Sequence, residues 1–240
     1  QLEIIEEVKT AVKNNEKITF LIQGSPGSGK TLLAIHLLIN SLALNKTTLL
    51  GYRNNRLINS LRNIFDNIDS GLSSAIKFYS VGPRRGSNGI AEKNFSSTTP
   101  LDLIIYDEAQ RMTKENIEFA MQRANVQVFF FDEKQILNVD EEGTFNNFRS
   151  IANKLSLNIK EKYLNGYYRI AGGKSYHDWL ENKISPSKNN NYNLSWRKLY
   201  DFQIFNSFDD FLSALKSKTT DNRVALLASF TESPGNSKNI

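Results

Sequence analysis

The sequence of 240 residues is long enough to bury a sizeable core, and a hydrophobic content of 40% is typical of a folded protein rather than a disordered chain. A formal net charge of +5 permits nucleic-acid binding without requiring it, because many ordinary proteins carry a similar excess. The absence of cysteine excludes a disulfide framework and a thiolate zinc site, and it fits a reducing, cytoplasmic location.

The first residues, QLEIIEEVKTAV, place Leu2, Ile5, Val8 and Val12 at helical spacing, so they predict an amphipathic helix and not a signal peptide. A strand-like run, ITFLIQ, and a helix-like run, LLAIHLLINSLAL, follow. No apolar stretch reaches the roughly 18 residues that a membrane span needs. We therefore expect no membrane partner.

Between those two runs lies GSPGSGKT, which satisfies the pattern G-x-x-x-x-G-K-[ST] in the strand-to-helix context of a phosphate-binding loop. Glycines let successive backbone N–H groups point at phosphate oxygens where the helix dipole is positive. We expect Lys30 to reach the β- and γ-phosphates of ATP and the Thr31 hydroxyl to bind Mg²⁺. The alternative is an ordinary glycine-rich turn before a helix. The predicted nucleotide-binding residues are Gly24, Ser25, Pro26, Gly27, Ser28, Gly29, Lys30 and Thr31.

The next segment, TTLLGYRNNRL, predicts a strand, a turn and then a helix. Its turn offers an aromatic ring, two cations and two amides, a mixture that suits contacts to the phosphates and bases of a single strand. The alternative is a polar turn that caps the helix. The candidate nucleic-acid residues are Tyr52, Arg53, Asn54, Asn55 and Arg56. Further on, residues 81–100 read as a long loop whose Arg84 and Arg85 are a second, weaker candidate.

A carboxylate partner for the metal is predicted at the end of LDLIIYDEAQR. The β-branched run predicts a buried parallel strand, and ligands of open parallel sheets bind where the carboxyl ends of the strands meet the loops. We expect Asp107 to serve Mg²⁺ and Glu108 to orient and deprotonate the attacking water. The alternative for this acidic pair is a solvated strand end.

A third strand, VQVFFF, ends in DEKQ, and its end should lie in the same crevice. The Gln135 amide can both donate and accept hydrogen bonds, so it could contact the γ-phosphate or the attacking water. The alternative is a loop glutamine without a ligand.

Strands alternate with helices as far as residue 169, which predicts an α/β fold with a parallel sheet and helices on both faces. A helix, KSYHDWLENKI, and a polar run, SPSKNNNYN, come next. The last segments, YDFQIFN, SFDDFLSALKS and NRVALLASF, predict a βαβ unit in which Ser207 caps the helix. We expect an ATPase domain at 1–180, a linker at 181–194 and the incomplete start of a second domain at 195–240.

The ordered motifs resemble those of superfamily 1 helicases, whose first RecA-like domain carries a strand ending in Gly-Asp-x-x-Gln and a later Leu-x-x-Asn-Tyr-Arg element. Here FDEKQ and LNGYYR are similar, with Phe131 in place of the glycine and Tyr167 in place of the asparagine. The resemblance implies that Gln135 senses the γ-phosphate and that Arg169 stabilises charge on the transferring phosphoryl group. It also implies that Gln1 reads adenine and that the loop after the second β-strand contacts single-stranded nucleic acid.

A closer resemblance is to the bacterial family called domain of unknown function 2075, whose helicase-like ATPase domain also occurs in Schlafen-type proteins. The likeness rests on the ordered set IQGSPGSGKTLLAIHLL, TLLGYRNNRLINSLRNIF, LIIYDEAQRM, FDEKQILNVDEEGTF, LNGYYRI and RVALLASF. It implies a RecA-like P-loop NTPase fold over most of the chain.

The leading hypothesis is Mg²⁺-dependent ATP hydrolysis coupled to binding, translocation on or remodelling of single-stranded DNA or RNA. The alternative is an ATP-operated switch that acts on a protein partner without nucleic acid. A kinase is disfavoured, because Glu108 and Gln135 are placed to manage water. A motor would also need the rest of its second domain, supplied within the intact protein.

Overall fold

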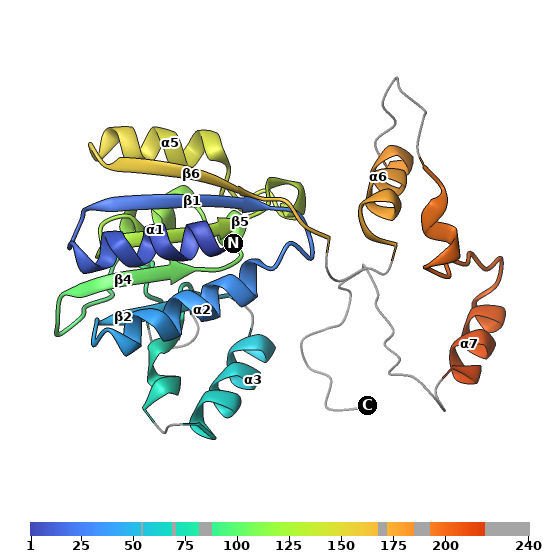
Figure 1. Ribbon diagram of the computed structural model, residues 1–240, viewed down its shortest axis with the longest axis horizontal. Helices are drawn as coiled ribbons and strands as arrows, with labels where there is room; N and C mark the ends of the chain where they lie inside the picture. Colours follow the sequence, from blue (N-terminus) through green and yellow to red (C-terminus); the bar gives the residue numbers. More distant parts are fainter. Residues whose placement is uncertain (54, 69–70, 82–87, 168–171, 185–192, 219–240) are drawn as a thin grey trace.

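The computed structural model describes residues 1–53, 55–68, 71–81, 88–167, 172–184 and 193–218 (Figure 1). Its helices, strands and short 3₁₀ helices (η) follow in the order α1 (Leu2–Lys13), β1 (Ile18–Gly24), α2 (Lys30–Ala43), β2 (Thr48–Tyr52), α3 (Asn55–Asp66), η1 (Leu72–Ala75), β3 (Ile76–Phe78), β4 (Leu101–Tyr106), η2 (Ala109–Arg111), α4 (Lys114–Ala120), β5 (Ala124–Phe131), η3 (Glu133–Gln135), α5 (Phe145–Lys154), β6 (Asn158–Leu164), α6 (Gly173–Ile184), η4 (Ser195–Lys198) and α7 (Phe208–Ser217).

Six strands of the described chain form one sheet in the order β3-β2-β4-β5-β1-β6, and every neighbouring pair is parallel. Parallel strands bring their carboxyl ends to one edge of the sheet. The register pairs Gln23 of β1 with Phe131 of β5, and Tyr106 of β4 with Phe129 of β5. The ends of β1 and β4 are therefore neighbours of the end of β5, which lies between them.

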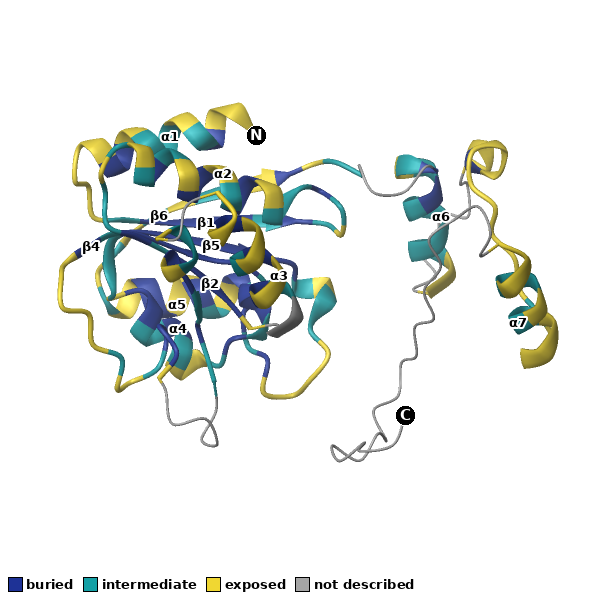
Figure 2. Cartoon of the chain, turned by 90° about the horizontal axis from the view of Figure 1, so that it is seen from below, coloured by how far each residue is buried: buried dark blue, intermediate teal, exposed yellow. Residues whose placement is uncertain are grey.

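Helices cover both faces of the sheet because its strands alternate their apolar side chains between two cores. Phe20, Ile105 and Val128 face the core built with α1, α2 and α3. Leu21 and Tyr106 face the core built with α4 and α5. Figure 2 shows the buried strands between α1 and α2 on one side and α4 and α5 on the other. The predicted α/β fold is confirmed.

The two departures from the helicase motifs are packing residues. Phe131 is fully buried, and its ring lies 4.8 Å from that of Phe145 and 4.9 Å from that of Phe148, both on α5. The ring of Tyr167 lies 4.6 Å from that of His177 on α6. Aromatic pairs at such distances add to the stability that burial gives.

The segment after β6 matches the sequence prediction only in part. Helix α6 forms where KSYHDWLENKI predicts it, and the Ser207 hydroxyl accepts a hydrogen bond from Asp210 N at the start of α7. The strand predicted over YDFQIFN is wrong, since residues 200–206 form none. The strand predicted over NRVALLASF lies outside the described residues. In both views α6 and α7 stand apart from the sheet (Figures 1 and 2).

None of the helices in the described ranges combines the length and the apolar character needed to cross a membrane.

Candidate nucleotide-binding site

The loop between β1 and α2 has the backbone geometry that its glycines permit. Gly27 and Gly29 have φ values of 78° and 93°, in the left-handed region where other residues are strained. Gly24 is packed so closely that a Cβ there would lie 2.4 Å from Ser28 Oγ and 3.0 Å from Leu164 Cβ. The pattern G-x-x-x-x-G-K-[ST] thus has the strand, the turn and the helix that a phosphate-binding loop needs.

Lys30 and Ser28 place polar groups on this loop. Lys30 Nζ donates hydrogen bonds to Gly24 O at 2.5 Å and to Ser25 O at 3.1 Å, so its ammonium group lies over the loop. Ser28 is buried, and its Oγ has no hydrogen-bond partner within the described chain. A phosphate oxygen is an acceptor that both groups could reach as donors.

Thr31 and Asp107 join the loop to the end of β4. Thr31 Oγ1 donates a hydrogen bond of 2.6 Å to Asp107 Oδ2, and Glu108 N donates one of 2.9 Å to Asp107 Oδ1. Asp107 is 1% exposed, and its burial raises the pKa of the carboxyl, although the two hydrogen bonds act in the opposite direction. A hydroxyl and a carboxylate oxygen at this distance are the ligand types that Mg²⁺ prefers.

Glu108 is contacted by Tyr79 through its backbone and by Arg111 through its carboxylate. Its φ of 54° is left-handed, and Tyr79 Oη, just after β3, donates a hydrogen bond of 3.1 Å to its carbonyl oxygen. Its carboxylate oxygen Oε2 lies 3.2 Å from Arg111 Nε, with both side chains about a third exposed. The predicted general base is therefore at the site edge, paired with a cation that the sequence reasoning did not select.

Gln135 lies on η3 at the end of β5, as predicted. Its Nε2 donates a hydrogen bond of 2.8 Å to Asp132 Oδ2, and the other oxygen of Asp132 accepts from Lys134 N at 3.1 Å. Gln110 is buried, and its Oε1 accepts a hydrogen bond of 3.3 Å from Asp132 N. The ends of β4 and β5 are thus joined through Gln110, a second residue that the sequence reasoning missed although it lies in the phrase DEAQR.

Gln1 reaches the phosphate-binding loop even though 27 positions separate it from Ser28. Its Nε2 donates a hydrogen bond of 2.9 Å to Ser28 O. A Cβ added at Gly29 would lie 2.7 Å from the same nitrogen, so only a glycine leaves room for this contact. The side chain expected to read adenine therefore lies beside the loop expected to bind phosphates.

The loop after β2 differs from the prediction. Tyr52 belongs to the strand and is 1% exposed, so the expectation that its ring stacks on a base is wrong. Arg53 Nη1 donates a hydrogen bond of 2.8 Å to Arg111 O. Asn54 lies outside the described residues, as do the side chains of Asn55 and Arg56 in the first turn of α3. Arg84, Arg85 and Arg169 also lie outside them.

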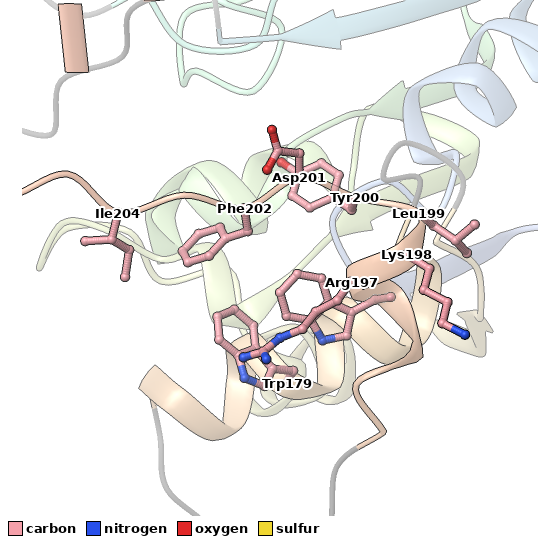
Figure 3. Close-up of a pocket in the computed structure, with 9 residues that line it drawn as sticks. Trp179, Arg197, Lys198, Leu199, Tyr200, Asp201, Phe202 and Ile204 are labelled. Carbon is pink, nitrogen blue, oxygen red and sulfur yellow. The ribbon is translucent and has the colours of Figure 1, made fainter. Parts of the chain in front are cut away.

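A hollow of about 720 Å³ lies away from these residues, along α6, η4 and the stretch before α7 (Figure 3). Its aromatic rings pack on one another, with Trp179 4.7 Å from Trp196 and 5.2 Å from Phe202. None of the phosphate-loop or strand-end residues lines it. The candidate nucleotide site is therefore the edge of the sheet and not this hollow.

A parallel α/β sheet with a phosphate-binding loop after its first strand, and a Thr–Asp pair that joins this loop to another strand end, defines a P-loop NTPase. The chain belongs to the Schlafen group 3 DNA/RNA helicase domain family, whose model matches residues 17–239. The match covers the sheet, the phosphate-binding loop and the strand ends, and it begins after Gln1 and α1. A comparison with curated proteins gave no match.

Solved structures with a similar fold share little sequence with this chain. The arterivirus nonstructural protein 10 helicase in complex with DNA is 16% identical with a TM-score of 0.42, over 75% of this chain and 44% of that one. The flagellar accessory protein FlaH from Methanocaldococcus jannaschii is 15% identical with a TM-score of 0.36, over 55% of this chain and 67% of that one. The DnaC helicase loader is 13% identical with a TM-score of 0.36, over 69% of this chain and 90% of that one.

Proposed function

We propose that this chain hydrolyses ATP with Mg²⁺ and couples hydrolysis to binding or movement of single-stranded DNA or RNA. The observation that carries the proposal is the 2.6 Å hydrogen bond between Thr31 and Asp107, which joins the phosphate-binding loop to the end of β4. Membership of a DNA/RNA helicase domain family supports the nucleic-acid half of the proposal. The resemblance to domain of unknown function 2075 supports the same reading.

Each candidate residue has a role that its chemistry supports. Lys30 and the loop N–H groups bind the phosphates, and Gln1 contacts the base. Thr31 and Asp107 are the residues that would hold Mg²⁺, which when bound offsets charge on the phosphate oxygens. Glu108 accepts a proton from the attacking water. Gln135 hydrogen-bonds the γ-phosphate, and Arg169 stabilises charge on the transferring group.

A second candidate function is an ATP-operated switch that acts on a protein partner. It is favoured by one observation, namely that the segment after β2 offers nucleic acid one group fewer than expected, because the ring of Tyr52 is buried. Both candidates use the same phosphate-contacting residues, so only the response to nucleic acid separates them. We propose that residues 195–240 begin a second domain in either case.

The decisive experiment is steady-state ATP hydrolysis with and without single-stranded DNA and RNA at two salt concentrations. Glu108→Gln should keep ATP binding and lower turnover by about 10²-fold or more, since it removes the proton acceptor. Lys30→Ala should lose both binding and turnover. Lys154→Ala is the matched control, because its ion pair with Glu118 joins α5 to α4 on the far face of the sheet.

Salt-sensitive stimulation by a strand supports the helicase reading, because phosphate contacts release counterions. Turnover that neither DNA nor RNA changes leaves two explanations, the switch and a motor that needs the rest of its second domain, and the same assay on a longer chain separates them. Normal hydrolysis by Glu108→Gln would show that the proton acceptor lies elsewhere.

A further inference from the structure

Glu108 is the near end of a chain of contacts that leads to the loop after β2. Arg111 Nε lies 3.2 Å from Glu108 Oε2, and Arg111 O accepts the hydrogen bond of 2.8 Å from Arg53 Nη1. Arg53 is the first residue after β2 and is 38% exposed at its side chain. A charged group that water and ligands can reach is therefore two contacts away from the proposed proton acceptor.

Arg53 also faces a buried carboxylate. Its Nη1 lies 3.6 Å from Glu141 Oε1, and the Glu141 side chain is fully buried. Burial alone would raise the pKa of Glu141, but hydrogen bonds from Leu137 N and Asn138, together with the charge of Arg111, outweigh it and hold the pKa below its usual value. Glu141 thus stays ionised at neutral pH and attracts the guanidinium of Arg53.

The segment that carries Glu141 is fastened to the segment that carries Arg111. Glu142 N donates a hydrogen bond of 2.8 Å to Met112 O, and Gly143 N donates one of 3.1 Å to Gln110 O. Gly143 is so close that an added Cβ would lie 2.1 Å from Ala109 O. Arg53 therefore binds to a preformed unit that consists of η2 and the segment 141–143.

The partner of the Glu108 carboxylate matters for the proposed role of Glu108 as proton acceptor. Arg53 follows β2 and Tyr79 follows β3, and both strands lie on the side of β4 opposite to β5 and β1. The phosphate-binding loop follows β1, and Gln135 follows β5. Oε2 of Glu108, which faces the Arg111 cation, is therefore a weaker proton acceptor for the attacking water than a carboxylate oxygen without such a partner.

We infer that Arg111 is a positioning residue that holds the Glu108 carboxylate away from the attacking water, and that Arg53 releases this restraint when it binds the phosphodiester backbone of a single strand. This inference rests on the proposed function of Glu108. The Arg111–Glu108 pair suits such an exchange, because Nε lies near Oε2 without the alignment of a hydrogen bond. Ion pairs that are about a third exposed are weak enough to be replaced by a ligand contact.

The test measures turnover by the full chain without a strand and with 20-nucleotide dT or rU. Arg111→Ala should raise the strand-free kcat about fivefold, leave the KM for ATP unchanged and reduce stimulation by the strand correspondingly. Arg111→Lys should stay near the wild type, because it keeps the charge. Arg111→Met, which keeps the apolar stem, serves if the alanine variant unfolds.

Arg53→Ala should also raise the kcat measured without DNA or RNA. The double variant Arg53→Ala/Arg111→Ala should have the same kcat as Arg111→Ala alone, since both residues act on one restraint. Lys154→Ala should leave both quantities unchanged.

Unchanged or lower strand-free kcat in Arg111→Ala and Arg111→Met overturns the inference, and the proposed function survives as long as Glu108→Gln still abolishes turnover. Additive effects of Arg53→Ala and Arg111→Ala also overturn the coupling between the two residues. Failure of the wild type to hydrolyse ATP overturns the proposed function and this inference together.

Discussion

At the scale of single residues, Asp107 shows how a site group can lower the stability of the fold that carries it. The carboxyl is buried, and this burial raises its pKa. A raised pKa means that the folded state binds the proton more tightly than the unfolded state does. Ionised Asp107 therefore opposes folding as pH rises through its ordinary pKa and toward its raised value.

Asp107→Asn should accordingly stabilise the chain at pH 7.5, by about 1 kcal/mol or more, because the amide needs no charge in the interior. The gain should shrink as pH falls from the raised pKa of the folded chain toward the ordinary pKa of an aspartic acid, and it should vanish below that value, because the carboxyl is then protonated in both the folded and the unfolded chain. Urea unfolding at several pH values measures both effects. A gain that stays constant with pH would show that folding does not shift the pKa of Asp107, and Thr31→Ser is the control that keeps the hydrogen bond to the carboxyl.

Tyr52 and Arg111 show why the sequence could not define the site in full. The run TTLLGY predicts a strand, but strand ends shift by a residue or two, and Tyr52 falls inside β2 and not in the loop. Arg111 lies three positions after Glu108, and only the 3₁₀ turn of η2 brings the two side chains together. The contact depends on a local conformation that the pattern DEAQR does not specify.

At the scale of elements, helix α1 is held to β6 by a charge cluster. Glu7 lies 2.8 Å from Lys160 Nζ and also pairs with Lys162, and these hydrogen bonds lower the pKa of Glu7 to about 2. A lowered pKa adds stability above the ordinary value, and that stability is lost as pH falls toward 2. The helix that bears Gln1 is thus fixed to the sheet partly by charge.

Glu7→Gln should lower the free energy of unfolding at pH 7 by about 0.5 to 1 kcal/mol, the range for partly exposed pairs. The difference from the wild type should diminish between pH 4.5 and pH 3, because Glu7 of the wild type begins to lose its advantage there. Thermal unfolding monitored by circular dichroism at several pH values measures this difference in stability. Glu6→Gln is the matched control, since Glu6 pairs with Lys9 of the same helix and, within the described residues, with no group of β6. Equal effects of both variants would contradict the prediction.

Most elements of the sheet were predictable because the central strands are short apolar runs and the helices carry an apolar period of 3.6. YDFQIFN alternates apolar and polar residues, yet it forms no strand, because alternation does not supply a neighbouring strand to accept its backbone hydrogen bonds. Instead the rings of Tyr200 and Phe202 pack against Tyr176 of α6. The position of β5 between β1 and β4 was likewise not predictable, because strand order depends on the whole set of packing contacts.

At the scale of the whole molecule, nucleotide binding and folding are linked, because the site is assembled from β1, α2, β4 and β5. A ligand that binds only the folded state stabilises it by about 2.7 kcal/mol at a concentration 100 times its Kd. We expect a non-hydrolysable ATP analogue with Mg²⁺ to raise the free energy of unfolding by this amount, as measured by urea denaturation.

Lys30→Ala should abolish this stabilisation while unfolding much like the wild type without ligand. Asp107→Asn should abolish only the part that depends on Mg²⁺. An equal stabilisation of Lys30→Ala and the wild type would place the nucleotide away from the loop between β1 and α2.

The contact between Gln1 and Ser28 makes the start of α1 a place from which the phosphate-binding loop can be observed. Leu2, the next residue, is 80% exposed, and the sequence contains no cysteine. A single thiol introduced by Leu2→Cys could therefore carry an environment-sensitive fluorophore at one defined position, with no competing site to block. Such a probe would report nucleotide binding in real time. A bulky purification tag joined next to Gln1 would instead disturb the contact between Gln1 and Ser28.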